Sequence, residues 1–484
     1  MSGITCIRRA DWAVVWRPAR DRSSGGGHRY QRGVDIAFDA DGVRYVGPSY
    51  TGPVAEEVDG KDRCVMPGLV SVHSHPTNQP ITRGVREELG NPKLYNSALY
   101  DRTGLWAPDD AGMLASGEAA LGELALSGVT TVIDYAGRAP EGWLDVLAKS
   151  GLRTYAAPAF RDAEWVVVNE SKLEYDWDEA RGRAAMERAF GLAEAASDHP
   201  SGRLTGVIAP AQVDTCTAKT LQESRRFAEA KGWMWQTHAA QSLTEFHEMT
   251  QRHGMTPIAW LASLGVLDDR ATLAHCIFAD AHPWTRWPAK QDLAILAKTG
   301  ATVAHCPVVF SRYGQTMQSL GRYIAAGVHV GLGTDTAPHN MLEEMRQALI
   351  LSRCASGELY DIQTTDVFNA ATIGGARAYG RDDIGRIAVG AKADLVLLDL
   401  SNRYMRPARD PIRSLIYTAA DRAVRDVYVD GARVVADGEV VTMDIPDALD
   451  RLDAAQAAAE AAVPARDAGG RAGRDISPLV FPED

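Results

Sequence analysis

Histidine and aspartate residues stand where several predicted strands end. The strand-end residues are His73, His75, His238, His275 and Asp335. His73 and His75 close the apolar run 69–72, and side chains two positions apart in a strand point to the same side. Where parallel strands alternate with helices, the carboxyl ends of the strands share one face, so residues far apart in the sequence converge there. The pattern therefore predicts one cluster of imidazoles with a carboxylate.

Such a cluster is typical of a catalytic metal site. Neutral imidazoles and one carboxylate are ligands that a divalent ion such as zinc prefers, with one position left for water. A bound ion lowers the pKa of that water from about 15.7 towards about 7, which makes a nucleophile available at neutral pH. His73 and His75 alone would be explained as well by two ordinary buried histidines, whereas the whole set favours a metal.

Strand and helix signals alternate between about residues 67 and 384. Apolar runs of strand type lie at 129–133, 153–157, 204–208, 233–236, 272–274, 302–304 and 328–332. Segments with helical periodicity lie between them, at 110–126, 178–196, 221–231 and 341–352. About eight alternations predict an α/β fold, most economically a distorted (β/α)8 TIM barrel over residues 67–384.

Both ends of the chain are rich in short β-type runs. Near the N-terminus these runs lie at 12–16, 34–38 and 43–46, and near the C-terminus they lie at 395–398, 424–429 and 440–441. The turn dipeptide Asp430-Gly431 marks a hairpin. We expect residues 1–66 and 385–445 to form one composite β-sandwich domain. Residues 446–484, rich in Ala and Asp, are predicted to form a surface helix and tail without a catalytic part.

Composition excludes several classes of protein. The chain has 484 residues, of which 45% are hydrophobic and 24% charged, so a large core is possible and global disorder is not. The net charge of −12 disfavours nucleic acid and anionic membrane surfaces as partners. No apolar run is long enough for a signal peptide or a membrane span. Six cysteines without a CxxC pair suit a reducing compartment, and we expect a cytoplasmic protein.

Several motifs resemble the amidohydrolase superfamily. The stretch VMPGLVSVHSH at 65–75 is similar to the metal motif after the first barrel strand of that superfamily. Further similar motifs are GVTTV at 128–132, TH at 237–238, AHC at 274–276, AHCP at 304–307 and GTD at 333–335, and residues 385–441 resemble the superfamily's C-terminal β-domain. The branch that the chain most resembles contains cytosine deaminase, guanine deaminase and triazine hydrolase.

The resemblance implies a metal site and its ligands. These ligands are His73, His75, His238 and Asp335. His275 would contact the substrate or the metal-bound water. Members with two metals bridge them with a lysine after the fourth strand, and here the first lysine after that strand is Lys219, so we expect one divalent ion, zinc in preference to iron, manganese or cobalt. The resemblance also implies a homo-oligomer, a dimer or larger.

One position departs from the pattern of the deaminase branch. That branch carries a proton-shuttling Glu three residues after the fifth-strand His, and here the position is Gln241. A neutral amide cannot exchange a proton in the required range. We rank Asp335 first and His275 second as the group that moves the proton. Glu245 ranks third, because a solvated carboxylate in a first helical turn is its simpler interpretation.

Other residues are candidates for substrate contact. The branch often has a His after the fourth strand, where this chain has Ala211 followed by Gln212. This departure weakens the expectation of a usual purine or pyrimidine contact. The candidate substrate-binding residues are Gln241, Gln212, His305, Trp106 and Phe310, although packing or loop capping would explain each of them as well.

These observations predict a hydrolase for small molecules. Our first interpretation is metal-dependent hydrolysis of a C–N, C–Cl or C–S bond in a substituted heterocycle, urea or (thio)carbamate. The alternative is an aminohydrolase for a purine, pyrimidine or triazine. A catalytically silent metal-binding homologue is a third possibility. A cysteine nucleophile at Cys276 or Cys306 is disfavoured, because the sequence identifies no base beside either thiol.

Overall fold

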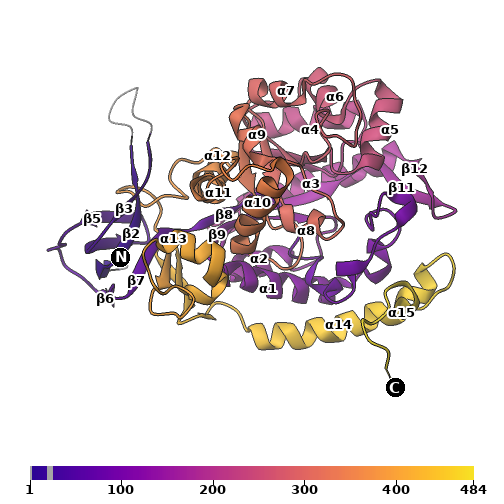
Figure 1. Cartoon of the computed structure of the whole chain (residues 1–484). Coiled ribbons are helices and arrows are strands. Elements are labelled where there is room, and N and C mark those ends of the chain that lie inside the picture. Colours follow the sequence, from indigo (N-terminus) through magenta and orange to yellow (C-terminus); the bar gives the residue numbers. More distant parts are fainter. Residues whose placement is uncertain (1–2, 19–25, 484) are drawn as a thin grey trace.

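The computed structural model describes residues 3–18 and 26–483, and these form an α/β part joined to a sheet part (Figure 1). The sheet part contains strands from both chain ends. Its N-terminal strands are β1 (Thr5–Ala10), β2 (Trp12–Arg17), β3 (Gly27–Gln31), β4 (Val34–Asp39), β5 (Gly42–Gly47), β6 (Glu56–Asp59) and β7 (Arg63–Pro67). Its C-terminal strands are β19 (Leu395–Asp399), β20 (Val424–Val429), β21 (Ala432–Ala436) and β22 (Glu439–Val440).

Strand β19 connects the two chain ends. It pairs antiparallel with β7 on one side and with β20 on the other, within a sheet ordered β22-β21-β20-β19-β7-β2-β3. Leu395 and Leu397 pack with residues of the second sheet, β5-β4-β1-β6, whereas Val396 and Leu398 belong to the core of the α/β part. This alternation follows from the two-residue period of a strand and explains why β19 is apolar on both faces.

The α/β part contains two parallel four-strand arrays, with the two-residue strand β14 (Ala209–Pro210) beside the first. The first consists of β8 (Leu69–Ser71), β9 (Val129–Ala136), β10 (Arg153–Phe160) and β13 (Leu204–Gly206), and the second of β15 (Trp235–Ala239), β16 (Ala271–His275), β17 (Thr302–His305) and β18 (His329–Leu332). Backbone contacts join the arrays at both edges: Val72 N–H donates to Leu332 O over 3.0 Å, and Ile208 forms a parallel bridge with Trp235. The carboxyl ends of all eight strands therefore lie close together.

Helices lie between these strands along the chain, and further helices follow β18. They are α1 (Asp110–Leu126), α2 (Trp143–Lys149), α3 (Glu179–Ser197), α4 (Ala218–Lys231), α5 (Leu243–His253), α6 (Pro257–Ser263), α7 (Asp292–Thr299), α8 (Pro307–Ser311), α9 (Leu320–Ala325), α10 (Met341–Ser356), α11 (Thr364–Asn369), α12 (Gly375–Ala378) and α13 (Pro411–Ser414). The predicted helix 110–126 is confirmed, and Asp109 caps it by accepting from Gly112 N–H. Helix α10 begins after the cap Asn340 and ends at Gly357, whose φ of 74° is the left-handed conformation that glycine tolerates.

Three further segments lie on the α/β part. The loop 72–109 connects β8 to α1 and contains four short 3-10 turns, η1 (Pro80–Thr82), η2 (Arg86–Glu88), η3 (Pro92–Leu94) and η4 (Thr103–Trp106). A hairpin of β11 (Ala163–Val168) and β12 (Lys172–Trp177) follows β10. The predicted C-terminal helix is present as α14 (Ile445–Arg466), followed by the short α15 (Gly473–Ile476), and it packs along α1 and the loop 72–109 (Figure 1).

Within the described ranges, no helix combines the length and apolar character required to cross a membrane.

Candidate metal centre and active site

The structure brings the five strand-end residues together. One ring nitrogen from each of His73, His238 and His275 lies within 4.8 Å of the others, and the same holds for His73, His75 and an oxygen of Asp335. The ring centroids of His73 and His238 are 4.7 Å apart. His73 and His75 lie directly after β8, as predicted. His238 is the second-last residue of β15 and His275 is the last residue of β16, so both lie within the strands rather than after them.

Backbone and amide oxygens fix the orientation of three imidazoles. Nδ1 of His75 donates to Tyr135 O over 2.6 Å, and Nδ1 of His238 donates to Ala211 O over 2.7 Å. Nδ1 of His73 faces Gln236 Oε1 at 2.8 Å. Because an oxygen acceptor requires the proton on Nδ1, each Nε2 carries the free lone pair that a metal needs. Nε2 of His73 is buried without a hydrogen-bond partner, which fits a metal ligand.

Asp335 is tied to the first two histidines through the backbone. Its N–H donates to His73 O over 2.9 Å, and its carbonyl accepts from His75 N–H over 2.8 Å. Its Oδ1 lies 3.3 Å from His75 Nε2 and 3.7 Å from His73 Nε2. This approach requires Gly333, since a Cβ there would meet His73 O at 2.5 Å. The carboxylate is 5% exposed, and burial raises the pKa of Asp335 above its ordinary value.

His275 is held in a strained backbone conformation. Its φ is 80°, in the left-handed region that non-glycine residues rarely occupy. Both ring nitrogens are buried without a hydrogen-bond partner, and the ring meets Phe310 edge-to-face with centroids 4.7 Å apart. Strain of this kind is found where a fold aims a side chain at a functional site. His275 is therefore available to a ligand in the cluster.

Burial keeps these imidazoles neutral. It lowers the pKa of His238 to about 3 and the pKa of His73 well below the ordinary value, with the neighbouring histidines adding to the effect. The pKa of His275 is lowered for the same reasons. A neutral imidazole is the form that binds a metal, so the donor set fits a divalent ion such as zinc without a change in protonation.

A cavity of about 340 Å³ opens beside the cluster. Its wall includes His75, His238 and Asp335, together with Gln212 and Gln241. A smaller pocket of about 30 Å³ continues from it and adds Phe310, while sharing Gln241 and Asp335. Three larger cavities in the described part of the chain, of about 560, 580 and 770 Å³, contain none of the clustered histidines in their walls. Chemistry rather than size therefore identifies the site.

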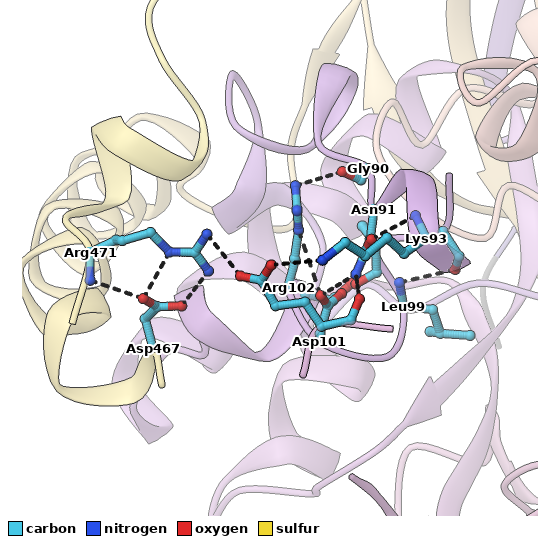
Figure 2. A network of polar contacts seen from close by, with 12 residues as sticks. Gly90, Asn91, Lys93, Leu99, Asp101, Arg102, Asp467 and Arg471 are labelled. Carbon is cyan, nitrogen blue, oxygen red and sulfur yellow. Dashed lines mark hydrogen bonds and ion pairs between the residues drawn. The ribbon is translucent and has the colours of Figure 1, made fainter. Parts of the chain in front are cut away.

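The loop 72–109 supplies the opposite wall and is held by distant segments. Gln456 of α14 donates to the carbonyls of Ile81 and Arg83, and Arg466 donates to Leu105 O and Ala107 O. Figure 2 shows a further network in which Arg471 pairs with Asp467 at 2.8 Å and approaches the loop around Asn91 and Asp101. Glu170, in the turn of the β11–β12 hairpin, links the two sides, being 3.3 Å from Arg471 and 3.5 Å from Lys93.

Three of the predicted substrate contacts lie at the cavity. These are Gln241, Gln212 and Phe310. Among the described residues the walls do not include His305, which is buried at the end of β17, or Trp106. The structure does not bring Trp106 to the cavity, because its indole N–H donates to Glu460 and its ring packs with Val463 of α14. Glu460 lies 354 positions after Trp106, so no local sequence pattern could predict this contact.

The expectation of a solvated Glu245 is wrong. The residue is 2% exposed, and its carboxylate accepts from the N–H groups of Ala240 and Gln241 over 2.6 and 3.1 Å. Burial and the charge of Asp214 raise the pKa of Glu245 well above its ordinary value. It therefore fixes the turn that presents Gln241 to the cavity. The disfavoured thiols Cys276 and Cys306 are buried, and burial raises the pKa of each, which opposes a nucleophilic role.

Sequence reasoning missed two residues of the site. Gln236 orients His73 and donates through Nε2 to Val72 O over 2.9 Å. Its position two residues before His238 in a strand was the available signal, since both side chains then share a face. Arg86 enters the cavity from η2, and nothing in its neighbourhood in the sequence marks it.

Comparison with known proteins agrees with this geometry. The Amidohydrolase family matches residues 64–434. A 5-methylthioadenosine/S-adenosylhomocysteine deaminase of Moorella thermoacetica is 28% identical over 418 residues, covering 84% of this chain and 91% of the relative. A 5'-deoxyadenosine deaminase of Methanothermobacter thermautotrophicus is 28% identical over 415 residues, covering 83% and 88%.

Solved structures share the fold. An adenosine deaminase from Xanthomonas campestris with bound zinc superposes with a TM-score of 0.77 at 22% identity, covering 94% of this chain and 98% of the other. An atrazine chlorohydrolase from Arthrobacter aurescens complexed with zinc gives a TM-score of 0.75 at 21% identity, covering 93% and 100%.

The match over most of its length places this chain in the amidohydrolase family. It is a metal-dependent hydrolase that acts on carbon–nitrogen bonds.

Proposed function

We propose that this chain holds one divalent metal ion, zinc by preference, and hydrolyses the bond between an amino group and a ring carbon of a nitrogen heterocycle. The observation that carries the proposal is that Nδ1 of His73, His75 and His238 each has an oxygen partner, which leaves the three Nε2 atoms free to bind a metal in the cluster that also contains Asp335. When bound there, the ion would supply a water nucleophile at neutral pH.

The chain's own residues have distinct proposed roles. Asp335 accepts the proton of the attacking water, because its carboxylate lies beside the ligand nitrogens, 3.3 Å from His75 Nε2. His275 contacts the substrate or that water through a ring nitrogen that has no other partner. Gln241 and Gln212 hold polar atoms of the substrate through their amides, and Phe310 supports His275. His305 stays a candidate without a contact at the cavity.

The names of the relatives support deamination. Two of them are called deaminases of adenosine-type nucleosides, and the cavity of about 340 Å³ is of a size that suits a small heterocycle. A purine-type amino compound is therefore the first substrate class to examine.

Gln241 supports a second candidate. Its amide occupies the cavity wall where the deaminase pattern has a proton-shuttling carboxylate. Chloride from a halogenated ring or a thiolate from a thiocarbamate leaves with less protonation than an amine does, so such substrates would suit this arrangement. We keep hydrolysis of such compounds as the alternative.

A substrate panel with metal analysis tests both candidates. Purified protein is analysed for zinc, iron, manganese and cobalt, and ammonia release from aminopurines, aminopyrimidines and aminotriazines is compared with amine or chloride release from ureas, carbamates and chlorotriazines. One equivalent of metal and chelator-sensitive ammonia release are expected. Two equivalents of metal would contradict the single-ion site, and bound metal without turnover across the panel would indicate a catalytically silent homologue.

We also propose a finer division of the chain. Residues 67–384 form a distorted (β/α)8 barrel, residues 1–66 and 385–445 a composite β-sandwich, and residues 446–484 a C-terminal helix and tail. Support comes from the pairing of β7 with β19 and from the two backbone links between the parallel arrays. We expect a homo-oligomer, which sedimentation analysis tests.

A further inference from the structure

A buried guanidinium lies in the wall of the cavity. Arg86 is 9% exposed and lines both the larger cavity and its smaller continuation, in company with Asp335 and Gln241. Its Nη1 donates to Gln79 Oε1, and its backbone carbonyl accepts from the hydroxyl of Tyr313. Its Nε is buried and has no hydrogen-bond partner. The side chain therefore has donor capacity that the protein does not use.

The charge of Arg86 is also unbalanced, in contrast to the other buried arginines. Among the described residues, three arginines are buried. Arg153 lies between Asp394 at 3.2 Å and Asp430 at 2.7 Å, and Arg225 is paired with Asp268. No carboxylate in the described part of the chain forms an ion pair with Arg86 within 4.0 Å. The carboxylate whose pKa the charge of Arg86 lowers is Asp335, a candidate metal ligand. A buried cation without a directly paired carboxylate is unfavourable, which points to a functional role.

A purely structural role does not explain this arrangement. An arginine kept only to hold the loop 72–109 would direct its nitrogens at loop carbonyls, as Arg102 does at Gly90 O. Arg86 instead bonds one amide side chain, Gln79, which itself lines the cavity. Arg161 also lines the cavity, but Glu164 neutralises it at 2.6 Å. The unbalanced positive charge is thus close to the clustered histidines and open to a ligand.

We propose that Arg86 binds a carboxylate substituent on the substrate ring, close to the carbon that is attacked. A planar guanidinium matches a carboxylate through two parallel hydrogen bonds, and its charge is then balanced only when substrate is bound. The substrate class is therefore an anionic nitrogen heterocycle. The location near the reacting carbon rests on the proposed function, whereas binding of the carboxylate itself does not.

Paired ligands test the proposal by calorimetry. Each pair shares a ring and differs by one carboxylate: uracil and orotate, purine and purine-6-carboxylate, pyrazine and pyrazine-2-carboxylate. Dissociation constants are measured with zinc-loaded and with metal-free protein, because a carboxylate can also bind the metal. For at least one pair we expect the wild-type chain to bind the carboxylate member about 10- to 100-fold more tightly in both forms.

Variants assign the preference to one side chain. Arg86→Met is expected to remove this preference while changing affinity for the neutral ring less than about threefold. Arg86→Gln retains a donor towards Gln79 but lacks the charge. It replaces Arg86→Met in this test if circular dichroism shows that the methionine variant does not fold. Arg86→Lys retains the charge without the planar fork and is expected to keep part of the preference. Arg161→Met is the matched control and is expected to leave the preference unchanged.

Two results would overturn the proposal. One is the absence of carboxylate preference in all three pairs with the wild-type chain. The other is the same preference in both Arg86→Met and Arg86→Gln. Either result leaves ammonia release from the substrate panel untouched, so it is distinguishable from a failure of the proposed function.

Discussion

The two walls of the cavity are built in different ways. On the strand side, three imidazoles are oriented by oxygen atoms in or next to neighbouring strands, such as Tyr135 O for His75 and Ala211 O for His238. On the loop side, Arg86 lies in a short 3-10 turn, and the loop 72–109 is held by side chains of α14 and by charged groups near Asp467 (Figure 2). If the proposed roles hold, the groups for the reaction lie on strand ends joined by backbone hydrogen bonds, and the group for substrate selection lies on a loop held mainly by side chains.

The largest expected effect comes from removal of a strand-side ligand. His238→Ala should lose bound metal and lower kcat/KM by more than about 10⁴-fold, because the nucleophile depends on the ion. Metal analysis and turnover on a substrate from the panel measure both. His329→Ala, at the opposite end of β18, is the control and should keep both. Full activity with stoichiometric metal in His238→Ala would remove the basis of the site.

The two candidates for proton transfer should differ in effect. At matched metal content, Asp335→Asn is expected to lower kcat about 10³-fold and His275→Asn about 10²-fold, since general acid–base contributions lie in this range. Single-turnover rates with metal-loaded variants make the comparison. If His275→Asn is the more damaging substitution, His275 is the base and our ranking is wrong.

The residue behind a ligand should have a smaller effect than the ligand itself. Gln236→Leu removes the acceptor of His73 Nδ1, so His73 can adopt the wrong tautomer, and metal affinity should fall about 10- to 100-fold. Competition with a chelator of known affinity measures this change. Gln236→Glu preserves an acceptor and should retain more affinity. Equal affinities in wild type and Gln236→Leu would show that the strand backbone alone orients His73.

Gln241 lies between the two walls and should affect the reaction without affecting the metal. Gln241→Ala is expected to retain metal and to lower kcat/KM about tenfold, the cost of one hydrogen bond to substrate. Gln241→Glu should not improve turnover of the native substrate, because a negative charge would lie against the nucleophile. A complete loss of turnover in Gln241→Ala would show that its amide has a larger part than we propose.

The smallest effect is expected in the charged network over the loop. Arg471→Ala should lower the free energy of unfolding by less than about 1 kcal/mol, because the Arg471–Glu170 pair is partly exposed and screened. Urea unfolding at low and high salt, with Glu170→Ala and the double variant, measures the coupling. A coupling energy well above about 1 kcal/mol would show that this charged network stabilises the loop more than a partly exposed ion pair normally does.

Much of the strand side could be predicted from the sequence. The ligands occur singly or in an HxH pair at the ends of apolar runs, and the two-residue period of strands then determines which side chains share a face. Helix α1 was also predictable to the residue, because its cap Asp109 and its many Ala, Leu and Glu residues, which favour helices, are local signals. Local sequence pattern was sufficient to predict those elements whose structure depends on strand alternation or helix capping.

The loop side, and also the turn that follows β15, depended on tertiary structure. Glu245 lies in a first helical turn, which suggested a solvated carboxylate, yet the turn at Ala240 and Gln241 folds over it. Trp106 was expected at the cavity and instead meets Glu460. The unpaired charge of Arg86 became visible only when the groups around it were placed. The sequence by itself determined the types of the candidate metal ligands and the strands that carry them. Tertiary structure decided the proposed substrate wall, because its contacts join segments that no periodicity connects.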